Sequence, residues 1–168
     1  VSEELLWDGI MAVILAISAI LIYVWFRFEW QFGVGAIIAL SHDVLSTIGL
    51  FSLISHEFNL ATVAAVLTIA GYSINDTVVV YDRVRENIRK FKAIEFSELL
   101  NLSINQTLSR TVMTSLTTLI ALISLYSLGG EVIRDFALAM IWGVMIGTYS
   151  SICLAVPLLI YMHIERPT

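Results

Sequence analysis

Five long apolar runs constrain this chain more than any other feature of its sequence. A helix that crosses a bilayer needs about 20 mostly apolar residues. The runs that reach about this length, with approximate ends, are 9–26, 34–54, 60–80, 111–128 and 136–161. We therefore predict an all-α polytopic membrane bundle of five transmembrane helices. The last is long enough to tilt, or to bend near Pro157.

Composition points the same way. Hydrophobic residues make up 58% of the 168 residues, and the mean hydropathy is +0.89, whereas soluble domains are about 45–50% apolar. The net charge of −5 argues against a nucleic-acid partner, which would require a basic face. We expect this chain to lie in a lipid bilayer and to bind no nucleic acid.

A short amphipathic segment, about 94–108, separates the third and fourth runs. Its apolar residues recur at helical spacing with polar residues between them, and they are Phe96, Leu99, Leu100, Ile104 and Leu108. This pattern is typical of a helix that lies at a membrane surface. The sequence thus predicts a short interfacial helix on the cytoplasmic side.

Basic residues predict the orientation, because Lys and Arg are retained on the cytoplasmic side of a membrane. If the N-terminus is outside, the only basic residue in the outer loops is Arg134. The inner segments then carry Arg27, Arg83, Arg85, Arg89, Lys90, Lys92, Arg110 and Arg166. We expect the N-terminus outside and the C-terminus inside.

Ionisable residues within the apolar runs are the first functional candidates, since a charge at the bilayer centre costs about 2.5–3.5 kcal/mol on insertion scales. Asp43, beside His42, falls near the middle of the second run. Asp76 lies about 24 Å along the third helix from its outer end, and Arg110 begins the fourth run. Burial favours the neutral form of a carboxyl group and a nearby arginine favours the charged form. A carboxyl balanced between them can load and release a proton, so these four residues are candidates for proton transport.

Structural roles stand beside this hypothesis. Asp76 could form a static salt bridge or a hydrogen bond that packs two helices. Asp43 and His42 could be a structural pair, a second proton relay or a pair of metal ligands, although adjacent helical residues point about 100° apart.

Two sets of small or polar residues accompany these groups. A supporting polar stripe is predicted from Ser73, Asn75, Thr114, Thr117 and Thr118, as helix packing or as a solute path. A packing seam on the last run, within the bundle or against a partner subunit, is predicted from Ala139, Gly143, Gly147, Ser151 and Ala155. The sequence contains no phosphate-binding Gly loop, Cys/His metal spacing or nucleophile elbow. We therefore expect neither an enzyme nor a metal.

Three long segments resemble the SecF family, the membrane subunits of the bacterial SecD–SecF accessory complex for protein export. They are "AGYSINDTVVVYDRVRENIRK", "RFEWQFGVGAIIALSHDVLSTIGL" and "INQTLSRTVMTSLTTLIALISLYSLGG". The resemblance covers nearly the whole chain and also places it in the resistance–nodulation–division transporter superfamily. The resemblance implies that these residues correspond to spans two to six of that plan, without its first span and periplasmic domain.

The resemblance implies a function in the bacterial inner membrane, with protons as the coupling ion and no other cofactor. Proton flow would move a periplasmic domain that helps to pull unfolded preprotein from SecYEG after SecA has pushed it in, with SecD as partner. The superfamily's proton-carrying acid falls on Asp76, and its basic partner on Arg110. The rival hypotheses are a proton-coupled exporter of small solutes or lipids in the same superfamily, and a non-conducting membrane scaffold.

Overall fold

Helices account for nearly all of the chain in the computed structural model, which describes residues 3–162 and 164. The elements are α1 (Glu3–Arg27), α2 (Trp30–Leu53), α3 (Leu60–Lys90), α4 (Phe96–Leu128), α5 (Glu131–Ser150), the π-helix η1 (Ser151–Ala155) and α6 (Val156–Tyr161). The described part contains no strand. The prediction of an all-α fold is confirmed.

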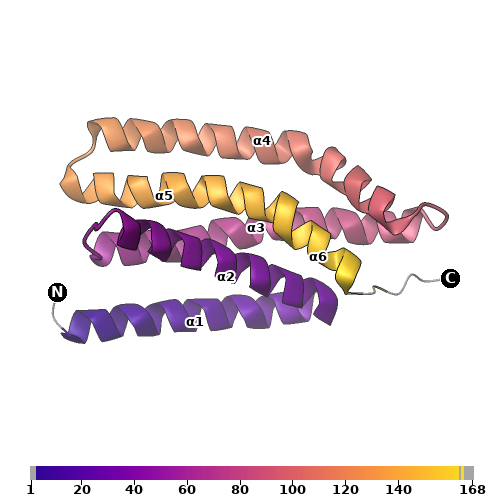
Figure 1. Cartoon of the computed structure of the whole chain (residues 1–168), viewed down its shortest axis with the longest axis horizontal. Coiled ribbons are helices and arrows are strands. Elements are labelled where there is room, and N and C mark those ends of the chain that lie inside the picture. The colour runs from indigo at the N-terminus through magenta and orange to yellow at the C-terminus, as the bar shows by residue number, and fades with distance from the viewer. Residues whose placement is uncertain (1–2, 163, 165–168) are drawn as a thin grey trace.

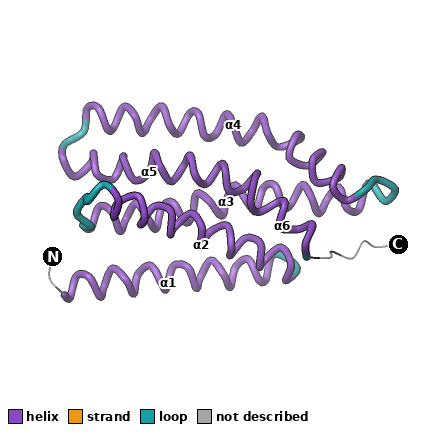
Figure 2. The backbone as a smooth tube through the Cα atoms, viewed as in Figure 1, coloured by secondary structure: helices purple, strands orange, loops and turns teal. Residues whose placement is uncertain are grey.

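The helices run side by side with short connections at alternating ends (Figures 1 and 2). The α2–α3 and α4–α5 connections lie at the end where the described chain begins, and the α1–α2 and α3–α4 connections lie at the other. α3 packs against α1, α2, α4 and α5, so it is the central helix of the bundle. Residues on α3 can therefore meet side chains from every neighbouring long helix.

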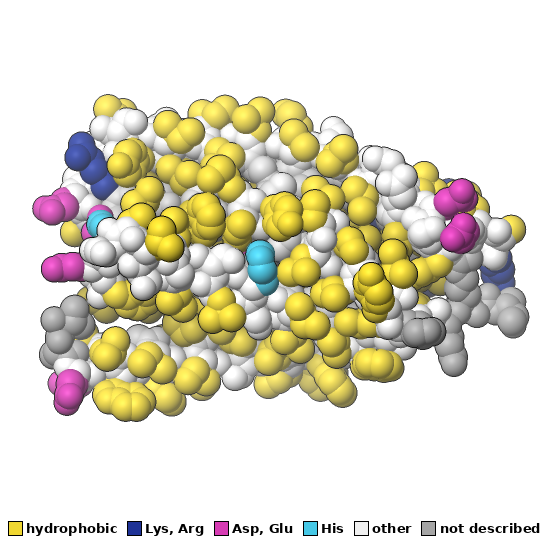
Figure 3. All heavy atoms as spheres, viewed as in Figure 1, with side chains coloured by type: hydrophobic (Ala, Val, Ile, Leu, Met, Phe, Trp, Pro, Cys, Tyr) yellow, Lys and Arg dark blue, Asp and Glu magenta, His cyan; other side chains and the backbone are white. Residues whose placement is uncertain are grey.

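The surface has the distribution of apolar and charged side chains that is expected in a bilayer. Five helical segments are long and apolar enough to cross a membrane. On the face shown in Figure 3, hydrophobic side chains cover the middle, and Lys, Arg, Asp and Glu side chains gather near the two ends. This distribution agrees with a multi-pass membrane protein, in which the long sides of the bundle face lipid.

The described basic residues are distributed unevenly between the two ends. Arg27 ends α1 and Lys90 ends α3, at the end of the bundle opposite the α4–α5 turn. Arg134 lies in the first turns of α5, next to that turn. An ion pair of 3.2 Å between Arg27 and Asp82 joins α1 to α3. Arg166 lies outside the described residues.

The amphipathic segment, about 94–108, is not the separate helix that the sequence predicts. It forms the first part of α4, which continues without a break from Phe96 to Leu128. This stretch contains neither Gly nor Pro, so nothing in it interrupts the helical hydrogen bonds. Figure 1 shows this first part sloping toward the end of α3.

The interior has a polar layer between two apolar clusters. The cluster near the α1–α2 turn contains Phe28, Phe32 and Tyr81, and the cluster near the α4–α5 end contains Phe51, Ile69 and Met140. Between them along their helices lie Asp43 on α2, Ser73 on α3 and Ser150 on α5. All three are almost completely buried. The layer contains the main candidate site.

Candidate functional site

Asp43 is the centre of a hydrogen-bonded group that joins three helices. Its side chain is 0% exposed. The Ser150 hydroxyl of α5 donates to Oδ2 of Asp43 at 2.8 Å, and the Ser73 hydroxyl of α3 donates to the same oxygen. His42 Nδ1 lies 3.1 Å from the other oxygen, Oδ1. Each carboxyl oxygen therefore has a partner, which offsets the cost of removing this group from water.

His42 differs from its neighbour because its side chain is 37% exposed. It lies beside Asp43 on α2, so it joins the buried group from the edge of the bundle. Within residues 3–162 and 164, no three His, Cys, Asp or Glu side chains are grouped so that they could hold a metal ion. His42 and Asp43 form a hydrogen-bonded pair at the edge of the buried group.

Asp76 lies one turn after Ser73 on α3 and is 6% exposed. Its Oδ2 atom is buried and has no hydrogen-bond partner among the described residues. The same is true of Oγ1 of the adjacent Thr77. A buried acceptor without a partner costs about 1–3 kcal/mol, and more when it is charged. Asp76 is thus far less well accommodated as a carboxylate than Asp43.

Two charged groups act on Asp76 electrostatically, Arg110 of α4 and Asp43 of α2. No ion pair within 4 Å joins Asp76 to Arg110 in the described structure. Arg110 is exposed and lines a polar cavity of about 350 Å³ between α3 and α4. The other lining residues are Val79, Asp82, Arg83, Glu86, Gln106 and Thr107. Val79 follows Asp76 by about one turn of α3, but Asp76 is not among the residues that line the cavity.

The predicted polar stripe on α4 is mostly on the wrong face. Thr117 is exposed, and Thr114 and Thr118 are only half-buried. The Thr117 and Thr118 hydroxyls donate to carbonyl groups of their own helix, at 2.8 Å for the shortest bond of each. Asn75 of α3 is also exposed. Of the five predicted stripe residues, only Ser73 reaches the buried group.

A different stripe of α4, which was not predicted from the sequence, faces the bundle. It consists of Ser103, Thr107, Thr111 and Ser115, spaced four residues apart and all buried. Ser115 lies 2.6 Å from the Thr148 hydroxyl of α5 and 3.3 Å from the Tyr72 hydroxyl of α3. Hydroxyl residues four positions apart could have pointed to this stripe. Thr114 and Thr118 have the same spacing, so the sequence does not show which of the two stripes faces the bundle.

The small-residue seam lies inside the bundle. All five of its residues are buried. A Cβ atom at Gly143 would overlap the Ile69 side chain of α3, and one at Gly147 would be 3.6 Å from Cβ of Ser73. α5 therefore lies directly against α3, and this close approach brings Ser150 within reach of Asp43.

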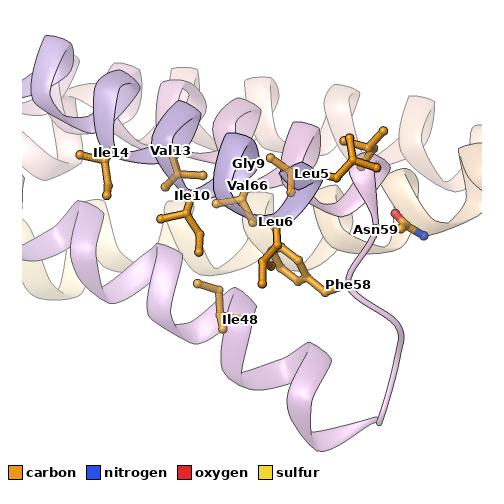
Figure 4. Close-up of a pocket in the computed structure, with 12 residues that line it drawn as sticks. Leu5, Leu6, Gly9, Ile10, Val13, Ile14, Ile48, Phe58, Asn59 and Val66 are labelled. Carbon is orange, nitrogen blue, oxygen red and sulfur yellow. The ribbon is translucent and has the colours of Figure 1, made fainter. Parts of the chain in front are cut away.

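A second cavity, of about 160 Å³, is apolar (Figure 4). It lies between α1 and the corner formed by α2 and α3. Its lining residues are Leu5, Leu6, Gly9, Ile10, Val13, Ile14, Ile48, Phe58, Asn59, Leu60, Val63 and Val66. None of these residues carries an ionisable side chain. This cavity therefore cannot exchange protons through its lining side chains.

The buried acids and the five-span topology can be compared with known proteins. Residues 1–165 match the family model for the protein export membrane protein SecD/SecF, C-terminal. This chain belongs to that family. Among curated relatives, the protein translocase subunit SecF of Rhodobacter capsulatus is 53% identical over 166 residues, and that of Cereibacter sphaeroides is 55% identical over the same length. Each alignment covers 99% of this chain, but only 50% and 51% of the respective relatives. This member of the SecD/SecF family thus spans about half the length of the curated relatives that it matches.

Solved structures of SecDF have the same fold as this SecD/SecF-family chain. The crystal structure of SecDF in a super-membrane-facing form matches with a TM-score of 0.88 and 52% identity, covering 96% of this chain and 22% of that one. A second structure, of the translocon-associated membrane protein SecDF from Thermus thermophilus, matches with a TM-score of 0.89 and 53% identity. It covers 92% of this chain and 22% of that one.

Proposed function

We propose that this chain is the membrane region of a SecF-type subunit that uses proton flow to assist preprotein export across the bacterial inner membrane. In this proposal it works with SecD, beside SecYEG and SecA. Membership of the SecD/SecF family supports the role in export. The observation that carries the role of protons is the buried Asp76, whose Oδ2 has no hydrogen-bond partner within the described residues.

The electrostatics of Asp76 support reversible protonation. Its charged form is unfavourable in an apolar interior, but the charge of Arg110 favours that form. Because Arg110 lies beside a polar cavity and is not locked to Asp76 by an ion pair, a small shift of α4 against α3 changes the balance. Asp76 then takes up or releases a proton.

The available energy is sufficient for a conformational change. One proton that crosses the membrane releases about 2.3 kcal/mol per 100 mV of potential. A domain with two states separated by a few kcal/mol responds to a bias of this size. In the proposed orientation, the end that carries Arg27 and Lys90 faces the cytoplasm, and the first residues of this chain face the periplasm.

The decisive experiment replaces Asp76 by Asn in the full SecD–SecF complex, in membrane vesicles that carry the translocon. Asn keeps the size of the side chain but cannot carry a proton. We expect normal assembly, with loss of proton conductance and of gradient-dependent export. Asp8→Asn is the matched control, because it makes the same chemical change at an exposed position on α1.

The same experiment separates the rival functions. A non-conducting scaffold should keep gradient-dependent export in Asp76→Asn, with at most a modest loss of assembly. An exporter of small solutes or lipids should lose proton conductance in this variant, while preprotein export in vesicles remains unchanged. Either result would overturn the proposed function.

A further inference from the structure

The last membrane-spanning segment contains a rare helical distortion. Residues Ser151–Ala155 form a π-helix between α5 and α6. Pro157, two residues later, has no N–H group, and its ring clashes with a carbonyl four residues before it in a regular α-helix. Figure 1 shows α6 leaving the line of α5 at this point. Single π-helical turns within α-helices are frequent at functional sites.

The end of the π-helix is held by Tyr81 of α3. The Tyr81 hydroxyl donates to the carbonyl oxygen of Ala155 at 2.7 Å, and the tyrosine is 0% exposed. The ring of Phe32 packs edge-on against the Tyr81 ring, with 5.2 Å between their centroids. On α2, Gly35 leaves the space that the hydroxyl occupies, since a Cβ atom there would overlap it. Two helices, α2 and α3, thus hold this one carbonyl group of η1 in place.

The start of the π-helix is connected to Asp43 through Ser150. The Ser150 hydroxyl oxygen lies 2.8 Å from Oδ2 of Asp43 and 3.1 Å from the carbonyl oxygen of Gly147. A hydroxyl has one proton, so it can donate to only one of these oxygens at a time. A charged Asp43 attracts this proton, because hydrogen bonds to ionised acceptors are stronger. A protonated Asp43 can donate to Ser150 instead, and the Ser150 proton then turns to Gly147.

We propose that η1 is a hinge through which the protonation state of the buried acids sets the direction of α6, with Ser150 as the positioning residue that transmits it. Protonation of Asp43 reverses its hydrogen bond with Ser150, so that the Ser150 proton turns to Gly147 in its own helix and the interhelical bond joins two neutral groups. A neutral hydrogen bond is weaker than a charge-assisted one, so the start of the hinge is held less firmly, while Tyr81 still holds its end at Ala155. α6 then pivots about the Tyr81 contact. The inference rests on the proposed function for its source of protons.

Several groups face Asp43 and share in the switch. His42 contacts it from the same helix, Ser73 and Ser150 contact it from α3 and α5, and Asp43 itself acts electrostatically on Asp76 of α3. Arg110 of α4 acts in turn on Asp76. Asp76 is therefore coupled to the hinge by its electrostatic interaction with Asp43, which is hydrogen-bonded to Ser150.

The test measures the position of α6 by the distance between two spin labels in the full SecD–SecF complex. The labels are placed at Ile160→Cys on α6 and Met113→Cys on α4, both exposed, in a background with Cys153→Ala. We expect the distance distribution to shift between acidic and alkaline pH. Ser150→Ala should abolish this shift, and Asp43→Asn should hold the distance at its acidic value at both pH values.

Ser151→Ala is the matched control. Ser151 is adjacent and equally buried, but its hydroxyl donates to the Thr148 carbonyl at 3.0 Å and not to Asp43. This variant loses a buried hydroxyl from the same helix, and should keep the shift. Thermal unfolding of both variants separates a loss of the switch from a loss of fold. Asp43→Asn tests the same connection with Ser150 intact.

The outcomes separate this inference from the proposed function. If Ser150→Ala shifts as the unsubstituted protein does, or if no protein shifts, the hinge is wrong. The proposed function then still stands, provided that Asp76→Asn loses proton-driven export. If Asp76→Asn exports normally while the spin-label distance still responds to Asp43→Asn and Ser150→Ala, the proposed function is wrong and the hinge stands.

Discussion

The Ser150 hydroxyl oxygen lies 2.8 Å from Oδ2 of Asp43, although the two residues are 107 positions apart in the sequence. This contact depends on the close approach of α5 to α3, where a Cβ atom at Gly143 would overlap Ile69 and one at Gly147 would only touch Ser73, at 3.6 Å. Packing by small residues therefore builds the polar site. The two features that the sequence presents separately, a buried acid and a small-residue seam, belong to one arrangement.

Gly143→Ala should destabilise the bundle, since the new Cβ atom overlaps the Ile69 side chain. We expect a loss of about 1–3 kcal/mol, which is typical of overpacking in a well-packed core. Thermal unfolding in detergent or nanodiscs measures it. Gly71→Ala is the control, because a Cβ atom there meets nothing within 4 Å. It should gain about 0.5–1 kcal/mol from the reduced flexibility of the unfolded chain. An equal effect of both substitutions would show that the contact with Ile69 is unimportant.

Gly35→Ala should be destabilising by about 1–3 kcal/mol, since the added methyl group overlaps the Tyr81 hydroxyl. In a Tyr81→Phe background this oxygen is absent, so the cost of Gly35→Ala should fall. A double-mutant cycle of unfolding free energies measures the difference, and coupled neighbours typically differ by about 0.5–3 kcal/mol. Additive effects would mean that Gly35 is needed for another reason.

Asp135→Ala should loosen the α2–α3 connection from α5. Asp135 lies 2.8 Å from Nε2 of His56 and accepts a hydrogen bond of 2.9 Å from the amide of Asn59, the N-cap of α3. We expect a loss of about 1 kcal/mol and faster hydrogen exchange in residues 54–62. Glu131→Ala, at an exposed position one turn earlier, is the control and should leave the exchange of this loop unchanged.

Asn87→Ala should weaken the contact between α3 and the first turns of α4. The Asn87 amide is buried and donates to Ser103 at 2.8 Å and to Gln106 at 2.9 Å. Removal leaves the Ser103 hydroxyl without its interhelical donor, so we expect a loss of about 1–3 kcal/mol. Hydrogen exchange in residues 96–107 should become faster. The exposed Asn105 provides the matched control, and similar exchange in Asn87→Ala and Asn105→Ala would contradict this role.

The sequence by itself determined that the chain is a membrane bundle and which acids lie within its apolar spans. An apolar run of about 20 residues can satisfy its backbone in a bilayer only as a helix. A carboxyl group is costly there, so Asp43 and Asp76 could be identified without a structure. The small-residue seam was also visible, because Gly143 and Gly147 lie on one helical face by spacing alone.

Tertiary structure alone decided which polar residues meet. α4 carries two hydroxyl stripes with the same spacing, one through Thr114 and Thr118 and the other through Thr107 and Thr111. Periodicity shows that residues share a face, but the direction of that face depends on where α3 and α5 pack. For the same reason Ser150 could not be assigned to Asp43, since hydrogen bonds between distant segments follow from the docking of whole helices. The π-helix at Ser151–Ala155 likewise depends on contacts, such as the Tyr81 hydrogen bond to Ala155, that sequence periodicity does not contain.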